Sequence, residues 1–229
     1  MSLLERAIEL AERGRGTTHP NPVVGAVVER DGEVVGEGWH ERAGEAHAEV
    51  NALRAAGERA HGATLYVSLE PCSHRGRTPP CTEAVVAAGI RRVVVGSLDP
   101  NPEVDGAAVL REAGVEVELV DTFEARRQNE AWRTWIRERR PFVTYKAAIA
   151  LDGRVVVPGT RWVTGEASRR RVHELRAAVD AVAVGMGTVR ADDPRLDARD
   201  VDAARQPRRL AFGRGPLPEG SGLEQRTGP

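Results

Sequence analysis

Along the first 140 residues of this chain, segments with apolar residues at helical spacing alternate with short runs rich in valine. Helices and strands that alternate in this way are typical of an α/β domain, in which helices cover a sheet. We therefore expect a three-layer α/β domain. The expected helices are Ser2–Arg13, His47–Gly57, Pro80–Ala88, Ala107–Ala113 and Glu124–Arg139, and the expected strands are Val23–Val28, Glu33–Gly36, Thr64–Leu69, Val93–Val95 and Val115–Val120.

Two features of the sequence divide the chain further. Asp31-Gly32 separates the first two expected strands, and this dipeptide favours the tight turn of a β-hairpin. The pattern restarts at Arg139-Arg140-Pro141, which predicts a boundary between a domain over residues 1–140 and a second one over residues 141–229. In the second domain we expect a strand over Phe142–Ile149, a helix over Ser168–Ala178 and a strand over Asp180–Val184.

Charge and hydropathy limit the class of partner. Lysine and arginine number 33 and aspartate and glutamate 34, for a net charge of −1 at pH 7. This balance gives no electrostatic footprint for nucleic acid or for a membrane surface. No apolar stretch approaches the roughly 18 residues of a membrane span, and the chain becomes charged at Glu5-Arg6, before a signal peptide could form. We expect a cytoplasmic protein whose partners are small molecules, not nucleic acid or a membrane.

The strongest chemical signal is His47-Ala48-Glu49, followed by Pro71-Cys72 and then by Cys81. One imidazole and two thiolates make three zinc ligands and leave the fourth tetrahedral position for water, as in a catalytic site. Zinc lowers the pKa of this water, and Glu49 can take its proton if His47 and Glu49 lie in the first turn of a helix. The sequence therefore predicts Zn²⁺ held by His47, Cys72 and Cys81, with Glu49 as the catalytic proton shuttle.

Each part of this pattern is weak by itself. A His-x-Glu triplet is common, and two cysteines also fit a role as small buried apolar residues. Their order favours a zinc site over buried apolar cysteines. His47-Ala48-Glu49 precedes an expected strand, Pro71-Cys72 follows that strand directly, and both cysteines fall in one loop. This order is typical of zinc nucleobase deaminases, although here eight residues separate the two cysteines.

Longer segments resemble one family of such deaminases. They are Thr17–Gly25, Glu37–His40, Ala43–Glu49, Leu69–Cys81 and Asp99–Pro102. Together they closely resemble the bifunctional deaminase–reductase of riboflavin biosynthesis. The resemblance implies an α/β fold with a three-layer cytidine-deaminase-like domain, followed by a partial dihydrofolate-reductase-like domain.

The resemblance also implies a substrate, a diamino-hydroxypyrimidine that carries a phosphoribosylamino group and is deaminated hydrolytically at the ring. By similarity, Asn21 and His40 would line the pocket for the base and the sugar, and Asn101 would approach the ligand from a loop at the end of a strand. As an alternative, Asn21 and Asn101 would only stabilise the turns beside neighbouring prolines.

Cationic residues lie between the two cysteines. His74, Arg75 and Arg77 offer donors that suit the phosphate of such a substrate. Their alternative role is that of solvated loop charges. We expect that at least one of them contacts the phosphate.

Four segments of the second half are Thr144–Arg154, Trp162–Gly165, Val172–Arg176 and Asp180–Leu196. They resemble the family's reductase domain, which uses NADPH to convert the ribosyl group to ribityl. Lys146 is the one lysine among 33 basic residues, which indicates either chance or a site that an arginine would not fit. Carried over by motif, the cofactor contacts are Ala148, Trp162, Thr188 and Asp192, and the substrate contacts are Lys146, Thr160, Arg176, Leu196 and Arg199.

The end of the chain departs from the family. Its reductase domain continues with further strands and a glycine-rich segment that completes the dinucleotide site, and nothing after Arg199 supplies these. Gly213–Gly222 contains glycines without the strand-to-helix context of a dinucleotide fingerprint. We therefore expect a truncated reductase half of doubtful activity, which would use NADPH only if it were completed.

Two other functions stay open at this point. One is a deaminase that acts on tRNA adenosine or on a cytosine nucleotide, although the net charge of −1 disfavours a phosphate-rich partner. The other is a non-catalytic binding module stabilised by zinc, which would have no need of Glu49 as a proton shuttle. Whether the chain forms a homo-oligomer is also open.

Overall fold

A computed structural model describes residues 1–160 and 162–224. The chain forms two compact units, Met1–Val143 and the segment from Thr144 onward. None of the helices in the described ranges combines the length and the apolar character needed to cross a membrane. The boundary at residues 140 and 141 stays a prediction, because compactness alone does not show where a separately folding domain ends.

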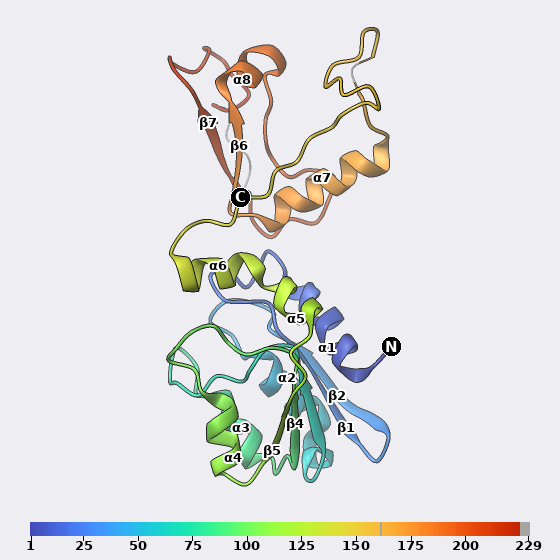
Figure 1. Ribbon diagram of the computed structural model, residues 1–229, viewed down its shortest axis with the longest axis vertical. Coiled ribbons are helices and arrows are strands. Elements are labelled where there is room, and N and C mark those ends of the chain that lie inside the picture. The colour runs from blue at the N-terminus through green and yellow to red at the C-terminus, as the bar shows by residue number, and fades with distance from the viewer. Residues whose placement is uncertain (161, 225–229) are drawn as a thin grey trace. The chain divides into compact units, whose positions relative to one another are not determined.

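The first unit is built on one five-stranded sheet (Figure 1). Its strand order is β2-β1-β3-β4-β5. β1 is antiparallel to both β2 and β3, whereas β3, β4 and β5 are parallel. The bounds are Gly25–Arg30 for β1, Glu33–Trp39 for β2, Thr64–Val67 for β3, Arg92–Val95 for β4 and Glu116–Leu119 for β5.

The predicted hairpin is confirmed. β1 and β2 pair from Gly25 opposite Trp39 to Arg30 opposite Glu33, with a register shift at Val28 and Glu29. Both turn residues, Asp31 and Gly32, have positive φ angles, of 53° and 86°. A turn with positive φ at both central positions is one that matches the twist of the two strands, and Asp-Gly is a favoured dipeptide for it.

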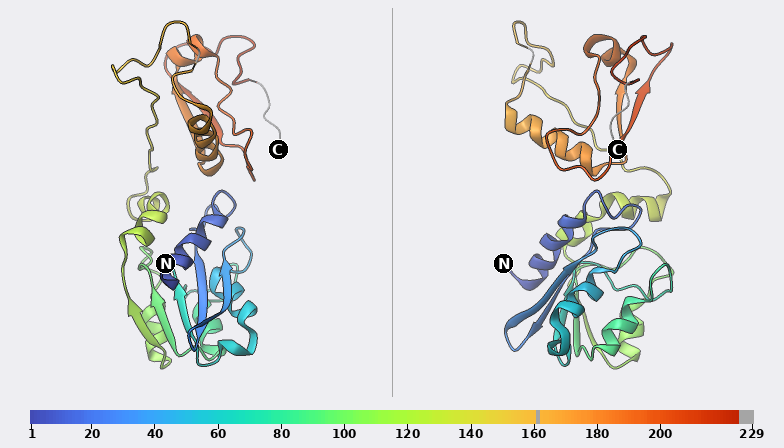
Figure 2. Two further views of the ribbon diagram at one scale, coloured as in Figure 1. Left: turned by 90° about the vertical axis from the view of Figure 1, so that its right-hand side faces the viewer. Right: turned by 180° about the vertical axis from the view of Figure 1, so that it is seen from behind.

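Helices cover both faces of this sheet, as the two further views in Figure 2 show. Successive residues of β1 point to opposite faces, so Val27 packs with Ala7 and Leu10 of α1, while Ala26 and Val28 join the main core on the other side. The predicted three-layer α/β architecture is confirmed. The helices are α1 Leu3–Ala11, α2 Ala48–Ala56, α3 Cys81–Ala87, α4 Gly106–Glu112, α5 Phe123–Gln128 and α6 Glu130–Glu138, with short 3₁₀ turns at Glu12–Gly14 and Gly57–Ala60.

The expected helix Glu124–Arg139 is wrong in one respect, because it is broken at Asn129 into α5 and α6. The buried Asn129 side chain accepts a hydrogen bond from the Val23 N–H (3.0 Å) and donates one to the Val23 carbonyl (2.8 Å). The amide thus satisfies both backbone groups of a buried residue just before β1. This contact with a residue 106 positions away fixes where the helix stops.

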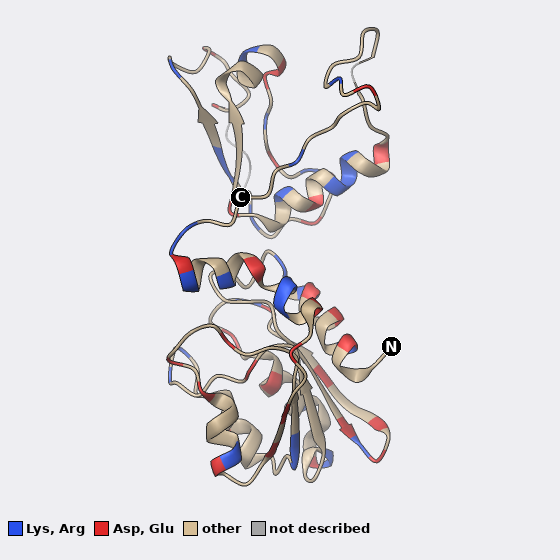
Figure 3. Ribbon diagram, in the orientation of Figure 1, with Lys and Arg blue, Asp and Glu red and all other residues tan. Residues whose placement is uncertain are grey.

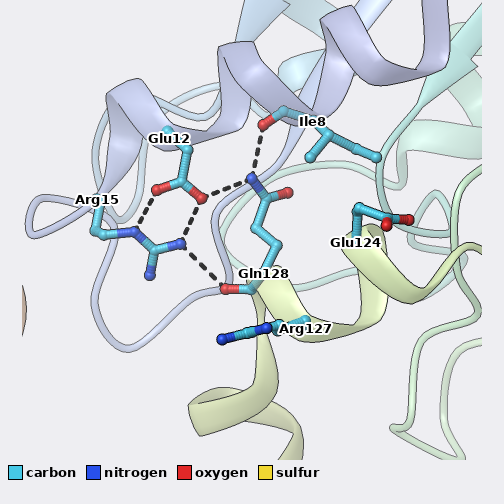
Figure 4. A pocket seen from close by; sticks show the side chains of 6 residues that line it. All are labelled: Ile8, Glu12, Arg15, Glu124, Arg127 and Gln128. Atoms are coloured by element: carbon cyan, nitrogen blue, oxygen red, sulfur yellow. Dashed lines mark hydrogen bonds and ion pairs between the residues drawn. The ribbon is translucent and has the colours of Figure 1, made fainter.

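The end of α5 is also fastened to α1 (Figure 4). Gln128 donates hydrogen bonds to the carbonyl of Ile8 (2.6 Å) and to Glu12 (2.8 Å), and Arg15 donates to the Gln128 carbonyl (3.1 Å). Glu12, Arg15 and Gln128 thus bind one another within a shallow pocket. The pocket lining consists of Ile8, Glu12, Arg15, Glu124, Arg127 and Gln128.

The second unit contains one small sheet, in which β6 (Ala181–Gly185) and β7 (Arg208–Phe212) pair in parallel. Its helices are α7 (Glu166–Ala178) and α8 (Met186–Asp192). Exposure alternates along both strands, and the buried apolar side chains among the described residues of this unit are few. The helix and strand expected at Ser168–Ala178 and Asp180–Val184 are confirmed to within two residues, whereas β7 had no counterpart among the expected elements.

The strand expected over Phe142–Ile149 is wrong. This segment lies in the long loop between α6 and α7 (Figure 1), without helix or strand, and most of its side chains are exposed. A strand exists only where a second strand accepts its hydrogen bonds. Among the described residues of this unit, β6 and β7 pair with each other, and the segment is hydrogen-bonded to neither strand as part of a sheet.

Candidate active site

The candidate site lies at one edge of the five-stranded sheet. The carboxyl ends of the parallel strands β3 and β4 lie side by side here, with Val67 opposite Val95. Because β1 is antiparallel to β3, the start of β1 and the end of β2 reach the same edge, where Gly25 pairs with Trp39. Ligands of α/β sheets bind beyond the carboxyl ends of parallel strands.

Three side chains meet at this edge. His47 directly precedes α2, Cys81 is the first residue of α3, and Cys72 lies in the segment that follows β3. Nδ1 of His47 lies 3.2 Å from Sγ of Cys81 and 3.6 Å from Sγ of Cys72. The three ligand atoms all lie within 4.8 Å of one another. The predicted cluster of metal ligands is therefore assembled in the structure.

The donor set fits zinc. With Zn–S near 2.3 Å and Zn–N near 2.05 Å, tetrahedral geometry places ligand atoms about 3.5–3.8 Å apart. The two distances from Nδ1 of His47 to the sulfur atoms, 3.2 Å and 3.6 Å, are close to these separations. Because Nδ1 faces both sulfur atoms, it is the nitrogen of His47 that would bind the metal. His47, Cys72 and Cys81 would thus fill three positions of a tetrahedron.

The electrostatics of the cluster favour a cation. The hydrogen bond from the Cys81 thiol and the one from His47 lower the pKa of Cys72 to about 4. The same shared proton, together with burial, raises the pKa of Cys81. The hydrogen bond with Cys72 raises the pKa of His47. Metal binding requires both cysteines as thiolates, and a divalent cation would stabilise the two negative charges.

Glu49 lies in the first turn of α2, two residues after His47. Its side chain is buried, and Oε2 has no hydrogen-bond partner among the described residues. Burial raises the pKa of Glu49 to about 7. A carboxyl group with such a pKa can both accept and release a proton near neutral pH.

His40 and Asn21 contact each other beside this cluster. The His40 ring is buried, and its Nδ1 lies 3.1 Å from the Ala46 carbonyl, so Nδ1 carries the proton. Nε2 then accepts a hydrogen bond from the Asn21 amide nitrogen, at 3.1 Å. Burial lowers the pKa of His40, which keeps the ring neutral. The rings of His40 and His47 meet edge to face with centroids 5.1 Å apart, so the predicted pocket residues Asn21 and His40 adjoin the metal ligands.

The cationic loop between the cysteines lies at the surface. His74, Arg75 and Arg77 are all exposed. Arg75 lies within 3.3 Å of Glu83 on α3, so its charge is already paired. Asn101 is half-buried in the loop after β4, where its Oδ1 accepts a hydrogen bond from the Glu103 N–H at 3.2 Å.

Two residues at this edge were missed in the sequence. The Oγ1 atom of Thr78 lies 3.4 Å from Nε2 of His47, on the side of the ring away from the sulfur atoms. The buried Glu70 accepts hydrogen bonds from the Asp99 N–H in the loop after β4 and from the Ala107 N–H at the start of α4. Its position offered a signal, since a carboxylate between the apolar strand β3 and Pro71-Cys72 has to be buried and therefore needs partners.

The second unit gathers only part of its predicted site. Arg176 on α7 donates a hydrogen bond to the Asp197 carbonyl (3.1 Å), and Arg199 pairs with the Asp197 carboxylate (2.7 Å). The buried Leu196 directly precedes Asp197. The other predicted positions lie apart from this cluster in the chain: Lys146, Ala148, Thr160 and Trp162 are in the loop before α7, and Thr188 and Asp192 are on α8.

Comparison with protein families agrees with the two units. Residues 1–97 match the cytidine and deoxycytidylate deaminase zinc-binding region. Residues 141–217 match the RibD C-terminal domain. The first match contains His47, Glu49, Cys72 and Cys81.

Curated relatives cover most of the chain. The riboflavin biosynthesis protein RibD of Aquifex aeolicus is 51% identical over 212 residues, which make up 90% of this chain and 60% of that protein. Its counterpart in Escherichia coli is 50% identical over 86% of this chain and 55% of that protein. The chain thus spans a little over half the length of these relatives.

Solved structures agree in sequence and in fold. RibD of Acinetobacter baumannii matches with a TM-score of 0.83 and 45% identity, over 94% of this chain and 64% of that one. A diaminohydroxyphosphoribosylaminopyrimidine deaminase/5-amino-6-(5-phosphoribosylamino)uracil reductase of Thermotoga maritima matches with a TM-score of 0.85 and 42% identity, over 93% and 62%. The chain belongs to the RibD family of riboflavin biosynthesis proteins.

Proposed function

We propose that this chain is a zinc-dependent deaminase that releases ammonia from a phosphoribosylated diamino-hydroxypyrimidine. One observation carries the proposal: His47 of the His47, Cys72 and Cys81 cluster is followed two residues later by Glu49, a buried carboxyl group with one unpartnered oxygen. A purely structural zinc site has no use for a buried acid with an unpartnered oxygen, because burying such an oxygen costs free energy. The name of the Thermotoga maritima relative supports the same substrate.

The reaction divides between the metal and this chain's own residues. When bound, zinc acts as a Lewis acid that activates water for attack on the ring carbon. Glu49 would accept one proton from the attacking water and deliver it to the ring nitrogen. It would then accept the second proton, from the hydroxyl group formed on the ring carbon, and deliver it to the departing amine. A C–O bond forms, a C–N bond breaks, and ammonia leaves without any change of oxidation state. The pKa of Glu49, about 7, suits both directions of transfer.

The neighbouring side chains support recognition of the pyrimidine and its sugar phosphate. The neutral His40 ring takes one N–H of the Asn21 amide, which fixes the Asn21 side chain beside the metal ligands. Asn101 would approach the base from the loop after β4. A Cβ atom at Gly44 would lie 3.9 Å from Nη1 of Arg77, so this guanidinium lies beside the loop that leads to His47. Arg77 and His74 are better phosphate donors than Arg75, which is paired with Glu83.

The alternative deaminases are less well supported. Basic and acidic residues are mixed along α5, α6 and α7 (Figure 3), and the net charge of the chain is −1. A tRNA substrate would require a continuous basic surface. We propose a cytoplasmic enzyme that binds neither nucleic acid nor membrane, and a homo-oligomer is compatible with every observation above.

The reductase half is a second candidate activity. The match of residues 141–217 to the RibD C-terminal domain favours it, together with the cluster of Arg176, Leu196 and Arg199 for the substrate. NADPH would contact Ala148, Trp162, Thr188 and Asp192. The segment that carries Ala148 forms no strand and is mostly exposed, and we propose that the reductase half of this chain does not hold NADPH productively.

One experiment separates the two activities. The zinc-loaded full chain is incubated with the phosphoribosylated diaminopyrimidine, and ammonia release and NADPH oxidation are measured in parallel. We expect ammonia without NADPH oxidation. Absence of ammonia from a protein that contains one zinc per chain would overturn the deaminase proposal, and a cytosine nucleotide assayed beside it would identify a different substrate.

A further inference from the structure

The loop after β4 is fastened to the segment that carries Cys72. The fastening side chain is Glu70, which is only 6% exposed. Its Oε2 accepts a hydrogen bond from the Asp99 N–H at 3.1 Å, and its Oε1 accepts one from the Ala107 N–H at 2.9 Å. One carboxylate therefore holds both ends of the loop that contains Asn101.

Three further contacts join the same two segments. The Glu70 N–H donates to the Ser97 carbonyl at 2.9 Å, and Ser73 Oγ accepts from the Asp105 N–H at 3.0 Å. A Cβ atom at Gly106 would lie 1.9 Å from the carbonyl oxygen of Pro71, so the backbones touch at a position where only glycine fits. The contacts lie on both sides of Cys72 in sequence, and the metal ligand and the loop therefore form one rigid piece.

The carboxylate is suited to this task in a way that other side chains are not. Two backbone N–H groups point at it, and each needs an acceptor because burial removes water. A carboxylate offers two acceptor oxygens, whereas the glutamine amide has one oxygen and one donating nitrogen. Within the loop, Asp99 accepts a hydrogen bond from the Asn101 N–H at 2.7 Å, which carries the constraint from Glu70 to Asn101.

We propose that Glu70 is a positioning residue, which sets the distance between Asn101 and the zinc ligand Cys72 and thereby determines how tightly the pyrimidine binds. This proposal rests on the proposed deaminase function. Glu70 has no part in the chemistry, so its effect is expected in KM and not in zinc content. Glu70, the acidic residue before Pro71-Cys72, thus positions the loop and binds no metal.

The kinetic test compares Glu70→Gln, Asn101→Ala and the double variant. We expect Glu70→Gln to keep one zinc per chain and to raise KM by about tenfold with a smaller change in kcat. In the double variant, KM should be no higher than in Asn101→Ala alone, because the two residues act through one loop. Glu37→Gln is the matched control, since it removes a half-buried carboxylate on β2 that is paired with Arg6 and should leave KM unchanged.

A second measurement does not depend on activity. In hydrogen exchange, peptides that cover residues 98–108 should exchange faster in Glu70→Gln than in the wild-type protein or Glu37→Gln. Ser73→Ala removes one exposed contact, should fold normally, and should raise KM in the same direction by less. If Glu70→Gln lowered thermal stability with KM unchanged, or if the two KM effects multiplied in the double variant, the role would be structural only. Failure of the wild-type protein to release ammonia would overturn the proposed function, while the exchange data would still report on the loop.

Discussion

Nδ1 of His47 lies 3.2 Å from Sγ of Cys81, although 34 positions separate the two residues in the sequence. Both side chains are placed by helix starts, since His47 directly precedes α2 and Cys81 begins α3. Unpaired N–H groups at a helix start favour negative charge, which stabilises the thiolate of Cys81 once a cation is bound. The fold thus brings together ligands that are far apart in the sequence.

The first prediction concerns zinc content. Cys72→Ala and Cys81→Ala should each bind well below one zinc per chain. Each substitution leaves only two of the three protein ligands, and two ligands do not hold the metal firmly. Metal analysis of the purified proteins measures this. His74→Ala is the matched control, since His74 is exposed in the same loop, and its zinc content should equal that of the wild type. Full zinc occupancy in either cysteine variant would contradict the assignment.

The second prediction concerns the proton shuttle. Glu49→Gln should retain zinc and fold, but lose on the order of 10²–10⁴-fold in the rate of ammonia release, because an amide cannot accept the proton. The measurement is the initial rate at saturating substrate, with zinc determined on the same sample. Glu45→Gln, an exposed carboxylate that pairs with Arg42, serves as control and should keep the wild-type rate. Near-normal turnover by Glu49→Gln would refute the mechanism.

A third prediction follows from the break between α5 and α6. Asn129→Ala removes the partner of both the N–H and the carbonyl of Val23, and leaves them buried without hydrogen bonds. We expect a loss of about 2–4 kcal/mol in the free energy of unfolding. Urea denaturation measures it, with Glu130→Ala as control at the neighbouring, exposed position. Equal losses in the two variants would mean that the Asn129 hydrogen bonds do not contribute to the free energy of unfolding.

The break at Asn129 also marks the limit of what the sequence predicts. Local signals were sufficient for the Asp31-Gly32 turn and for the order of helices and strands in the first unit, because these depend on neighbouring residues. The helix break depends on Val23, and no periodicity reveals a partner 106 positions away. The strand expected at Phe142 failed for a related reason, since strand propensity cannot supply a pairing partner.

The metal ligands were predictable for the opposite reason. Cysteine and histidine have few chemical roles, so the order of His47, Cys72 and Cys81 in the sequence restricts the choices to a zinc site. Glu70 is an ordinary acidic residue in sequence, and only its burial and its two backbone donors distinguish it. Residue type thus predicts the ligands, whereas the supporting contacts emerge only from the folded chain.

A fourth prediction concerns pH. Burial raises the pKa of Asp99 from 3.8 to about 6, and the nearby Glu70 adds to the rise. The folded state therefore binds this proton more tightly than the unfolded state, and the contribution of Asp99 to stability falls as pH rises from about 4 to about 6. Asp99→Asn keeps an acceptor for the Asn101 N–H and removes the charge.

The expected result is a gain of about 1 kcal/mol at pH 7, after allowance for solvent screening at this half-buried site, that shrinks toward zero near pH 4. Urea denaturation of both proteins at each pH measures the difference. Both proteins carry the same zinc ligands, so their common pH dependence cancels. A gain of the same size at both pH values would show that Asp99 does not titrate in this range.

The last prediction tests the division of the chain. The five-stranded sheet of the first unit is covered on both faces, whereas the strands of the second unit expose alternate side chains and the loop before α7 is largely exposed. Exposed loops are preferred sites of proteolysis. Trypsin should therefore cut first between Arg139 and Arg154, and leave a fragment of about residues 1–140 that retains zinc and releases ammonia. Mass spectrometry, metal analysis and the ammonia assay identify this fragment. A second unit that resisted trypsin and oxidised NADPH in the intact chain would show instead that the reductase half is complete in itself, or is completed by another copy of the chain.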